Sequence, residues 1–296
     1  MNAESILSLF PPPVEEIPLV GAYLQHDIRG LAAAHSGLPY IYANFVVSLD
    51  GRIAITRKSG DLVSGAALNE PGPNAEELIV PRAIANSRDW RLFQELVAQA
   101  DILLSSGRYL RDWAAGKAQE ILQVDDPRYA DLRQWRVAHG LPLHPDIAII
   151  SRSLDFSIPP VITSEARKAI LITTKEAADK GADRLSMDLG SRLSRVIIAG
   201  DHSLDVKNMR DQLAGLGYNV IYSAAGPRIL HLLASGGVLD RLYFTLAHRL
   251  LGGETYASLL AGSLLDPAIG MRINQILLDP YALDRAGQLF LSYDSV

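Results

Sequence analysis

Short apolar segments alternate with segments of helical periodicity along most of the chain. The apolar segments are rich in Val, Ile, Leu, Tyr and Phe, which is typical of buried strands. Strands are expected at residues 40–48, 52–56, 101–105, 146–151, 169–173, 195–199, 219–223, 241–246 and 288–293. Helices are expected at residues 87–100, from 106–107 onward, 205–215 and 227–235. Residues 60–81 are expected to form an ordered loop, and residues 114–144 a helical or irregular segment. This alternation predicts an α/β fold with a mostly parallel central sheet and helices on both faces.

Residues 1–38 have a different pattern and predict an N-terminal arm, laid over a domain that spans residues 39–296. The arm contains Pro11-Pro12-Pro13, then Glu15-Glu16, then a helical stretch near residues 21–35.

The helix expected at residues 87–100 has the clearest helical signals in the chain. Ser87 is the expected N-cap, and an acidic residue follows early in the first turn. Leu92, Leu96 and Val97 then fall on one face, as helical periodicity requires for packing against a sheet.

Composition and charge favour a globular protein that binds a small molecule. The chain has 296 residues and a formal net charge of −5, with 28 Lys and Arg against 33 Asp and Glu. Hydrophobic residues make up 48% of it, which excludes wholesale disorder. The sequence has no cluster of Lys and Arg that would bind nucleic acid, and no run of about 18 apolar residues that could span a membrane. It also has no recognisable signal peptide. We therefore expect a cytoplasmic enzyme or binding protein.

The chain contains no cysteine. This excludes disulfides, Cys-ligated zinc, iron–sulfur clusters, a cysteine nucleophile and the zinc deaminases of nucleobases, which need Cys ligands. The seven histidines include no pair at the i, i+4 spacing that places two metal ligands on one helix face. We expect no metal.

Two strand-to-helix turns have the form that binds phosphate, since backbone N–H groups at a helix N-terminus attract anions. The first is Ser106-Gly107-Arg108, where Gly107 allows close approach of the backbone and Arg111 follows one turn later. The helix dipole disfavours cations at this end, and a bound 2′-phosphate would offset that effect. The alternative is two solvated surface arginines.

The second turn is Ala225-Gly226-Pro227. Gly226 forms the bend, and Pro227 suits the first position of a helix. The N–H groups of the next residues then point outward, where a pyrophosphate could accept their hydrogen bonds. The alternative is an ordinary turn, because neither segment is a G-x-G-x-x-G fingerprint and the chain has no Walker sequence.

Residues 48–54 (SLDGRIA) resemble the S-L-D-G-[KR]-I-A motif of the bacterial riboflavin-pathway pyrimidine reductases, which share the dihydrofolate-reductase fold. Further segments are similar to motifs of that family and follow in the same order: residues 100–104 (ADILL), 106–109 (SGRY), 225–227 (AGP), 238–242 (VLDRL) and 250–253 (LLGG). The resemblance covers residues 39–296.

The resemblance implies hydride transfer from NADPH to a phosphoribosyl- or ribityl-pyrimidine, and a homodimer formed through this domain. It implies cofactor binding by Val46, Ser48, Asp50, Ser106, Gly107, Arg108, Tyr109, Arg111, Ala225, Gly226, Pro227, Arg228, Ile229 and Leu230. Bifunctional members of the family carry a zinc deaminase ahead of the reductase. Because only a short Cys-free segment precedes residue 39, we expect that activity to be missing.

At three positions where the family holds its substrate, this chain has uncharged residues. Asn44 replaces a Lys, Val97 replaces an Arg, and Ala224 replaces a Glu. Loss of the Lys and the Arg removes charge-assisted contacts to phosphate worth about 1.5–3 kcal/mol each. Tyr109 and His248 also depart from the family pattern. We therefore expect a divergent heterocyclic substrate, and weak or no activity on the phosphoribosylamino-pyrimidine.

Two carboxyl groups are candidates for catalysis. Asp89 begins a segment that resembles the dihydrofolate-reductase helix whose acid binds the pterin, although an acid there also stabilises a helix N-terminus. Asp50 lies in the S-L-D-G motif and could be only a hairpin residue. Arg91 and Glu95 lie on one helix face, as replacement charges for the substrate or as a solvated i, i+4 pair.

Two functions remain open. The first is an NADPH-dependent reductase that resembles the 5-amino-6-(5-phosphoribosylamino)uracil reductase of riboflavin biosynthesis. The second is a non-catalytic NADP-binding sensor or partner subunit, which kept the sheet and lost the substrate contacts. NADPH binding without turnover across candidate substrates would favour the second.

Overall fold

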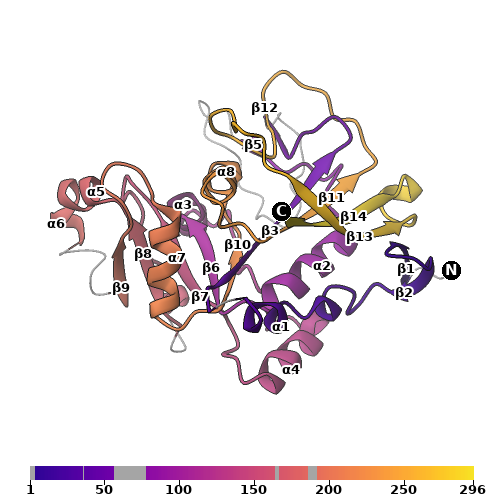
Figure 1. The fold of residues 1–296 in the computed structure, drawn as a ribbon, viewed down its shortest axis with the longest axis horizontal. Coiled ribbons are helices and arrows are strands. Elements are labelled where there is room, and N and C mark those ends of the chain that lie inside the picture. Colours follow the sequence, from indigo (N-terminus) through magenta and orange to yellow (C-terminus); the bar gives the residue numbers. More distant parts are fainter. Residues whose placement is uncertain (1–3, 36, 57–77, 164–166, 186–191) are drawn as a thin grey trace.

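One sheet of eleven strands runs through the described part of the chain, which is residues 4–35, 37–56, 78–163, 167–185 and 192–296 of this computed structural model (Figure 1). The strand order is β2-β1-β13-β14-β11-β3-β10-β6-β7-β8-β9. These strands are β1 (Ser5–Phe10), β2 (Glu15–Pro18), β3 (Tyr40–Ser48), β6 (Ile102–Ser106), β7 (Asp146–Ile150), β8 (Ala169–Thr173), β9 (Arg195–Ile198), β10 (Val220–Ser223), β11 (Arg241–Ala247), β13 (Met271–Asp279) and β14 (Gln288–Ser295). A small second sheet contains β12 (Tyr256–Ala257), β4 (Ala54–Thr56) and β5 (Leu78–Ile79).

The strands from β11 to β9 run parallel to their neighbours, with β3 between β10 and β11. The remaining strands, β14, β13, β1 and β2, pair antiparallel. Parallel strands covered on both faces have continuous apolar sequences, and β8 is accordingly buried along its whole length. The predicted α/β fold with a mostly parallel central sheet is confirmed.

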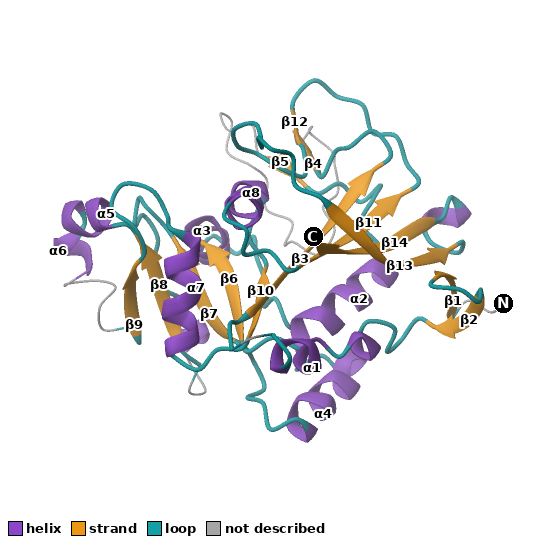
Figure 2. Ribbon diagram, in the orientation of Figure 1, coloured by secondary structure: helices purple, strands orange, loops and turns teal. Residues whose placement is uncertain are grey.

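Helices cover the parallel part of the sheet on both faces (Figure 2). One face carries α1 (Ile28–Ala33), α2 (Ser87–Ala98), α3 (Gly107–Ala114) and α4 (Ala130–Ala138). The opposite face carries α7 (Val206–Gly215) and α8 (Pro227–Ser235). The other helical segments are α5 (Lys175–Lys180), α6 (Ala182–Arg184), η1 (Leu24–His26), η2 (Pro127–Tyr129), η3 (Pro160–Thr163) and η5 (Leu283–Arg285).

The N-terminal residues extend the main sheet, which the sequence did not lead us to expect. β1 pairs with β13, and Leu7 lies opposite Leu278. β2 then pairs with β1 at the edge of the sheet. Ile6 is fully buried in the core beneath α2. Leu7, the next residue of the strand, points to the opposite face of the sheet, because successive side chains of a strand alternate between the two faces. The predicted helical stretch near residues 21–35 contains η1 and α1.

Most expected elements of the domain lie where the sequence placed them, and the differences have local causes. β13 was missed because Arg272, Asn274 and Gln275 interrupt its apolar pattern. The N-cap of α2 is Asn86 and not Ser87: the Asn86 side chain accepts hydrogen bonds from the N–H groups of Arg88 and Asp89 at 3.0 and 3.1 Å. The loop expected at residues 60–81 lies mostly outside the described residues.

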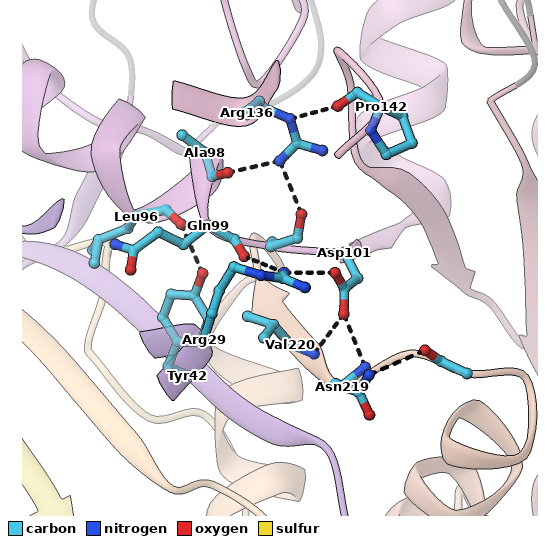
Figure 3. Close-up of polar contacts among 12 residues, drawn as sticks. Arg29, Tyr42, Leu96, Ala98, Gln99, Asp101, Arg136, Pro142, Asn219 and Val220 are labelled. Carbon is cyan, nitrogen blue, oxygen red and sulfur yellow. Dashed lines mark hydrogen bonds and ion pairs between the residues drawn. The ribbon is translucent and has the colours of Figure 1, made fainter. Parts of the chain in front are cut away.

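Polar contacts connect the segments that surround the amino ends of the parallel strands (Figure 3). Asp101 accepts hydrogen bonds from Arg29 at 2.6 Å and from the N–H of Val220 at 2.9 Å. Arg136 is fully buried and donates to the backbone oxygens of Ala98, at 2.7 Å, and Ala100, at 3.0 Å, at the end of α2. These contacts leave the carboxyl ends as the place for a binding site, which is usual for parallel sheets.

Candidate active site

Polar side chains gather where β3 and β11 pass beneath the first turn of α2. Tyr42 and Tyr243 face the α2 side of the sheet, and the strand alternation puts Asn44, Val46 and Thr245 on that same side. Thr245 lies opposite Val46 in the register of the two strands. A site at this position has β3, β11 and α2 as its walls.

Asp89 is the acidic group of this site. It belongs to the first turn of α2 and is 8% exposed. Burial raises the pKa of Asp89 to about 6, and a hydrogen bond from the Thr245 side chain opposes part of that rise. A carboxyl group with this pKa exchanges its proton near neutral pH, which suits a proton donor or a partner for a heterocycle N–H group.

Three further polar groups on the neighbouring strands have a side-chain atom without a partner among the described residues. The side-chain oxygen Oδ1 of Asn44 is buried in the middle of β3, and the hydroxyls of Ser105 and Ser223 are buried at the ends of β6 and β10. A buried polar atom without a hydrogen bond costs about 1–3 kcal/mol, so each of these atoms has capacity to bond to a ligand. Ala224 follows β10 and packs with the aromatic residues of the same face. The site therefore offers hydrogen-bonding groups and no cation at Asn44 or Ala224.

The turn before α8 has the features of a phosphate site. Gly226 is the N-cap and is exposed, and a Cβ added there would meet nothing within 4 Å. In the described part of the chain no hydrogen bond uses the N–H groups of Ala225, Gly226 or Arg228. Those of Ile229 and Leu230 bond to the oxygen of Gly226 at 3.0 and 3.2 Å. The free N–H groups fit a bound pyrophosphate.

The side chains of α8 divide between solvent and core. Arg228 is exposed, Pro227 occupies the first helical position, and Leu230 is buried in the core with Ile229 packed against it. The Leu230 side chain is therefore shielded from a cofactor, whereas the Ile229 side chain is partly exposed.

The turn before α3 is more closely packed than the sequence suggested. A Cβ on Gly107 would lie 3.0 Å from Cδ1 of Phe156. The lack of a side chain at Gly107 therefore makes room for the Phe156 ring. Arg111 donates to the Asp155 oxygen at 2.7 Å. Arg108 is 55% exposed and its Nη2 donates to the Leu78 oxygen at 3.2 Å.

The two remaining positions of this turn differ in their freedom to bind a ligand. Ser106 is the N-cap of α3 and makes no capping hydrogen bond with its side chain. Tyr109 donates its hydroxyl to the oxygen of Gln119 at 2.9 Å. Arg108 and Ser106 are therefore the side chains of this turn best placed for an anion.

Asp50 fixes the turn after β3. Its carboxylate accepts hydrogen bonds from the Ser48 hydroxyl and from the N–H of Gly252 at 2.8 Å, and it forms an ion pair with Arg52. The Ser48 hydrogen bond is the main cause that lowers the pKa of Asp50 to about 2. At neutral pH Asp50 therefore has no proton to donate, and its contacts hold two turns together.

Several residues considered from the sequence have structural roles. Val97 is fully buried in the core. Glu95 is fully buried too and accepts hydrogen bonds from the N–H groups of Gly21, at 2.6 Å, and Tyr23, at 2.9 Å. Arg91 pairs with Glu95 at 2.9 Å, so this i, i+4 pair is buried and not solvated as expected.

The structure adds groups to the site that sequence reasoning missed. Thr245 was overlooked because it occupies one position of an apolar strand with no motif around it. Its place two residues after Tyr243 on the same face is the only signal that could have found it. Ser105 was included in a strand without any assigned role.

The family model of the RibD C-terminal domain matches residues 39–275. The chain therefore belongs to the RibD C-terminal domain family. The resemblance to the pyrimidine reductases of riboflavin biosynthesis is confirmed, and the site described above lies within the matched residues.

Solved structures of such reductases have a similar fold. A pyrimidine reductase-like protein from Corynebacterium diphtheriae is 20% identical, with a TM-score of 0.61 over 87% of this chain and 92% of that one. A bifunctional deaminase/reductase from Thermotoga maritima is 12% identical, with a TM-score of 0.56; the match covers 92% of this chain and 62% of that one. A riboflavin biosynthesis reductase from Saccharomyces cerevisiae is 12% identical, with a TM-score of 0.51 over 92% and 98%.

A comparison with curated proteins gives no match. None of the helices in the described residues is long and apolar enough to cross a membrane. Within those same residues, no group of three or more His, Asp or Glu side chains is arranged to hold a metal ion.

Proposed function

We propose that this protein is an NADPH-dependent reductase of a heterocyclic substrate, related to the 5-amino-6-(5-phosphoribosylamino)uracil reductases. The observation that carries the proposal is the buried carboxyl group of Asp89 with a pKa near 6, on the same side of the sheet as the buried side-chain oxygen of Asn44 on β3. Family membership supports the reaction class. A homodimer and a cytoplasmic location, which the resemblance and the composition suggest, belong to the same proposal.

The chain has groups that fit a dinucleotide across the carboxyl ends of β3, β10 and β6. The free N–H groups around Gly226 would bind the pyrophosphate, and the guanidinium of Arg108 would pair with a 2′-phosphate. Val46 would contact the nicotinamide end at β3. When bound, the cofactor supplies a hydride. Asp50 acts as a positioning residue, because it holds the Gly252 turn against the turn that follows β3.

Asp89 orients the substrate and supplies the proton. Its carboxylate accepts hydrogen bonds from ring or amino N–H groups of the heterocycle, and the Thr245 hydroxyl fixes the rotation of that carboxylate. When protonated, the same carboxyl oxygen donates to the ring nitrogen next to the carbon that is reduced. Asn44 gives a neutral hydrogen bond where the reductases of the family have a Lys. The side chains on α2 exclude water from this end of the site.

The substrate is proposed to lack the sugar phosphate of the riboflavin precursor. Asn44 and Ala224 are uncharged, Val97 is buried, and Arg91 and Glu95 are occupied with each other. Expression of this chain in a riboflavin-requiring strain without its own reductase tests the point. We expect weak or no growth. Robust growth at native expression would restore the riboflavin precursor as the substrate.

Titration with NADPH is the first test of the reductase proposal. We expect binding below about 100 µM, followed by NADPH oxidation with one member of a panel of aminopyrimidines, pterins and quinones. The Asp89→Asn variant should bind NADPH as the wild type does and lose turnover. Absence of binding of both NADPH and NADH would overturn the proposal.

A non-catalytic sensor is the second candidate function, favoured by the uncharged Asn44 and Ala224. Binding of NADPH with no oxidation across the whole panel would support it. Under that outcome Asp89→Asn would change neither the affinity for NADPH nor any turnover.

A further inference from the structure

Arg136 is a fully buried cation that forms no ion pair with a carboxylate of the described residues. It lies near the end of α4, and its Nε and Nη1 donate to the backbone oxygens of Pro142, Ala98 and Ala100 (Figure 3). Its Nη2 is buried as well and has no hydrogen-bond partner in that part of the chain. Burial lowers the pKa of Arg136 to about 10, so the side chain still carries its charge at neutral pH. A buried charge is costly unless it is paired and fully hydrogen-bonded.

Arg167 has a second buried nitrogen of the same kind. Its side chain is 5% exposed and lies just before β8. Nε donates to the oxygen of Pro145 at 2.6 Å, and Nη1 donates to the carboxylate of Glu120 at 2.8 Å. Nη2 is buried and bonds to nothing among the residues that the structure describes. Two guanidinium groups therefore each have N–H donors to spare.

These two guanidinium groups are neighbours at the amino ends of the parallel strands. Arg136 bonds to the oxygen of Ala100, just before β6, and Arg167 bonds to the oxygen of Pro145, just before β7. β6 and β7 pair directly, and paired strands lie about 4.8 Å apart. After burial, repulsion from Arg167 is among the causes that lower the pKa of Arg136. Both guanidinium groups can therefore contact one small ligand.

The carboxylates bonded to this cluster do not balance its charge. Asp101 pairs with Arg29 at 2.6 Å, and Glu120 pairs with Arg167 at 2.8 Å. With Arg136, three cations therefore face two carboxylates, and one positive charge remains. This excess favours an anion, because a guanidinium binds the oxygens of a phosphate through charge-assisted hydrogen bonds.

His144 adds a third buried nitrogen, in the loop between Pro142 and Pro145 that both arginines contact. Its Nε2 lies 3.3 Å from the carboxylate of Asp125, so in the neutral ring this nitrogen holds the proton and Nδ1 is an acceptor. Nδ1 is buried and unpartnered within the described ranges. Two donors and one acceptor complement a hydrogen phosphate ion, whose oxygens accept and whose O–H donates.

We propose that Arg136, His144 and Arg167 bind a small phosphate anion at the amino ends of β6 and β7. This place is at the opposite edge of the sheet from the proposed active site. Because all three unpartnered nitrogens are out of contact with solvent, the ligand is of the size of inorganic phosphate and not a nucleotide. The bound anion would cancel the excess charge and join α4 to the segment before β8, so it should stabilise the fold. The inference does not depend on the proposed activity.

Thermal unfolding at pH 7 tests the site, with sodium phosphate replacing sodium chloride at constant ionic strength. We expect a rise in Tm that saturates with phosphate, as for any ligand that binds only the folded state. Arg167→Gln should weaken the apparent affinity for phosphate by about tenfold or more. Arg133→Gln is the matched control, because Arg133 lies on α4 with Arg136 but is half exposed, and it should respond as the wild type does.

A second comparison separates this site from the proposed cofactor site. Phosphate should still raise the Tm of Arg108→Ala, and of the wild type with saturating NADPH. A rise that disappears in either case would place the anion at the cofactor site and overturn the proposal. Equal Tm values in phosphate and in chloride would also overturn it, as would the same loss of response in Arg133→Gln. If Arg167→Gln does not fold, line broadening of the ³¹P signal of phosphate by the wild type, and its reduction in His144→Ala, decide the question.

Discussion

The carboxylate of Asp50 accepts a hydrogen bond from the N–H of Gly252, and this contact joins two turns that lie 202 positions apart in the chain. The N–H of Leu251 bonds to the same carboxylate at 3.2 Å, and Arg52 reaches from Asp50 to the oxygen of Gly253 at 3.0 Å. The S-L-D-G and L-L-G-G segments are therefore two halves of one local structure at the end of the central strand.

Asp50→Asn should weaken this connection. The amide keeps one oxygen acceptor but places N–H donors against N–H groups and loses the ion pair with Arg52. We expect a Tm lower by about 2–4 °C at pH 7 and weaker NADPH binding. Because the pKa of Asp50 is lowered to about 2, its stabilising effect is present above the unfolded value near 3.8 and is lost as the pH falls through 2. The difference in Tm should therefore vanish in acid, and Asp284→Asn, whose side chain is 99% exposed, should change nothing.

Asp89→Asn should stabilise the fold while it removes turnover. Burial raises the pKa of Asp89 from 3.8 to about 6, so the folded wild type binds more protons than the unfolded chain between these values. Its stability therefore falls by about 2 kcal/mol as the pH rises from 4 to 6, and the amide escapes this loss. Thermal unfolding at pH 4 and pH 7 measures the effect. A variant less stable than the wild type at pH 7 would contradict it.

Thr245→Val also tests the role of the Asp89 carboxyl group, because the Thr245 side chain is hydrogen-bonded to it. Removing the hydroxyl removes the hydrogen bond that lowers the pKa of Asp89, so that pKa should rise further. Because Asp89 acts as the proton donor, activity is lost as the pH rises through its pKa, so we expect the basic limb of the kcat profile to move to higher pH, with the affinity for NADPH unchanged. An unshifted profile would show that Asp89 does not set the pH dependence.

Arg108→Ala should weaken the binding of NADPH and leave that of NADH unchanged. The guanidinium of Arg108 is exposed at the head of α3, and its loss should cost about 1.5–3 kcal/mol toward a 2′-phosphate. Arg111→Ala is the matched control, since that side chain is bound to the Asp155 oxygen. Equal losses for both cofactors would show that Arg108 does not bind the 2′-phosphate.

Glu95→Ala should destabilise the protein by about 3–5 kcal/mol, because it leaves Arg91 half-paired in the core and frees the N–H groups of Gly21 and Tyr23. Denaturant unfolding measures this loss. Glu120→Ala, which removes a partly exposed partner of Arg167, should cost less. A loss below 1 kcal/mol at Glu95 would contradict the structural role.

The sequence predicted the parallel strands well because each is an unbroken apolar run, as at Ala169–Thr173. It predicted the antiparallel edge poorly, since the polar residues of β13 contact partners such as His26 that lie far away in the chain. The site was found in part for a similar reason. Asp89 and Gly226 stand in short local patterns, whereas the burial of Glu95 depends on backbone near residue 21.

The pairing of β1 with β13 constrains the order in which the chain can fold during synthesis. Residues 5–10 leave the ribosome long before their partner strand at residues 271–279 has been made. The apolar segment that includes Ile6 and Leu7 therefore lacks its partner strand β13 while most of the domain is translated. Contacts so distant in the chain form late, so we expect this edge to close after the parallel core and to be where a nascent chain first needs a chaperone.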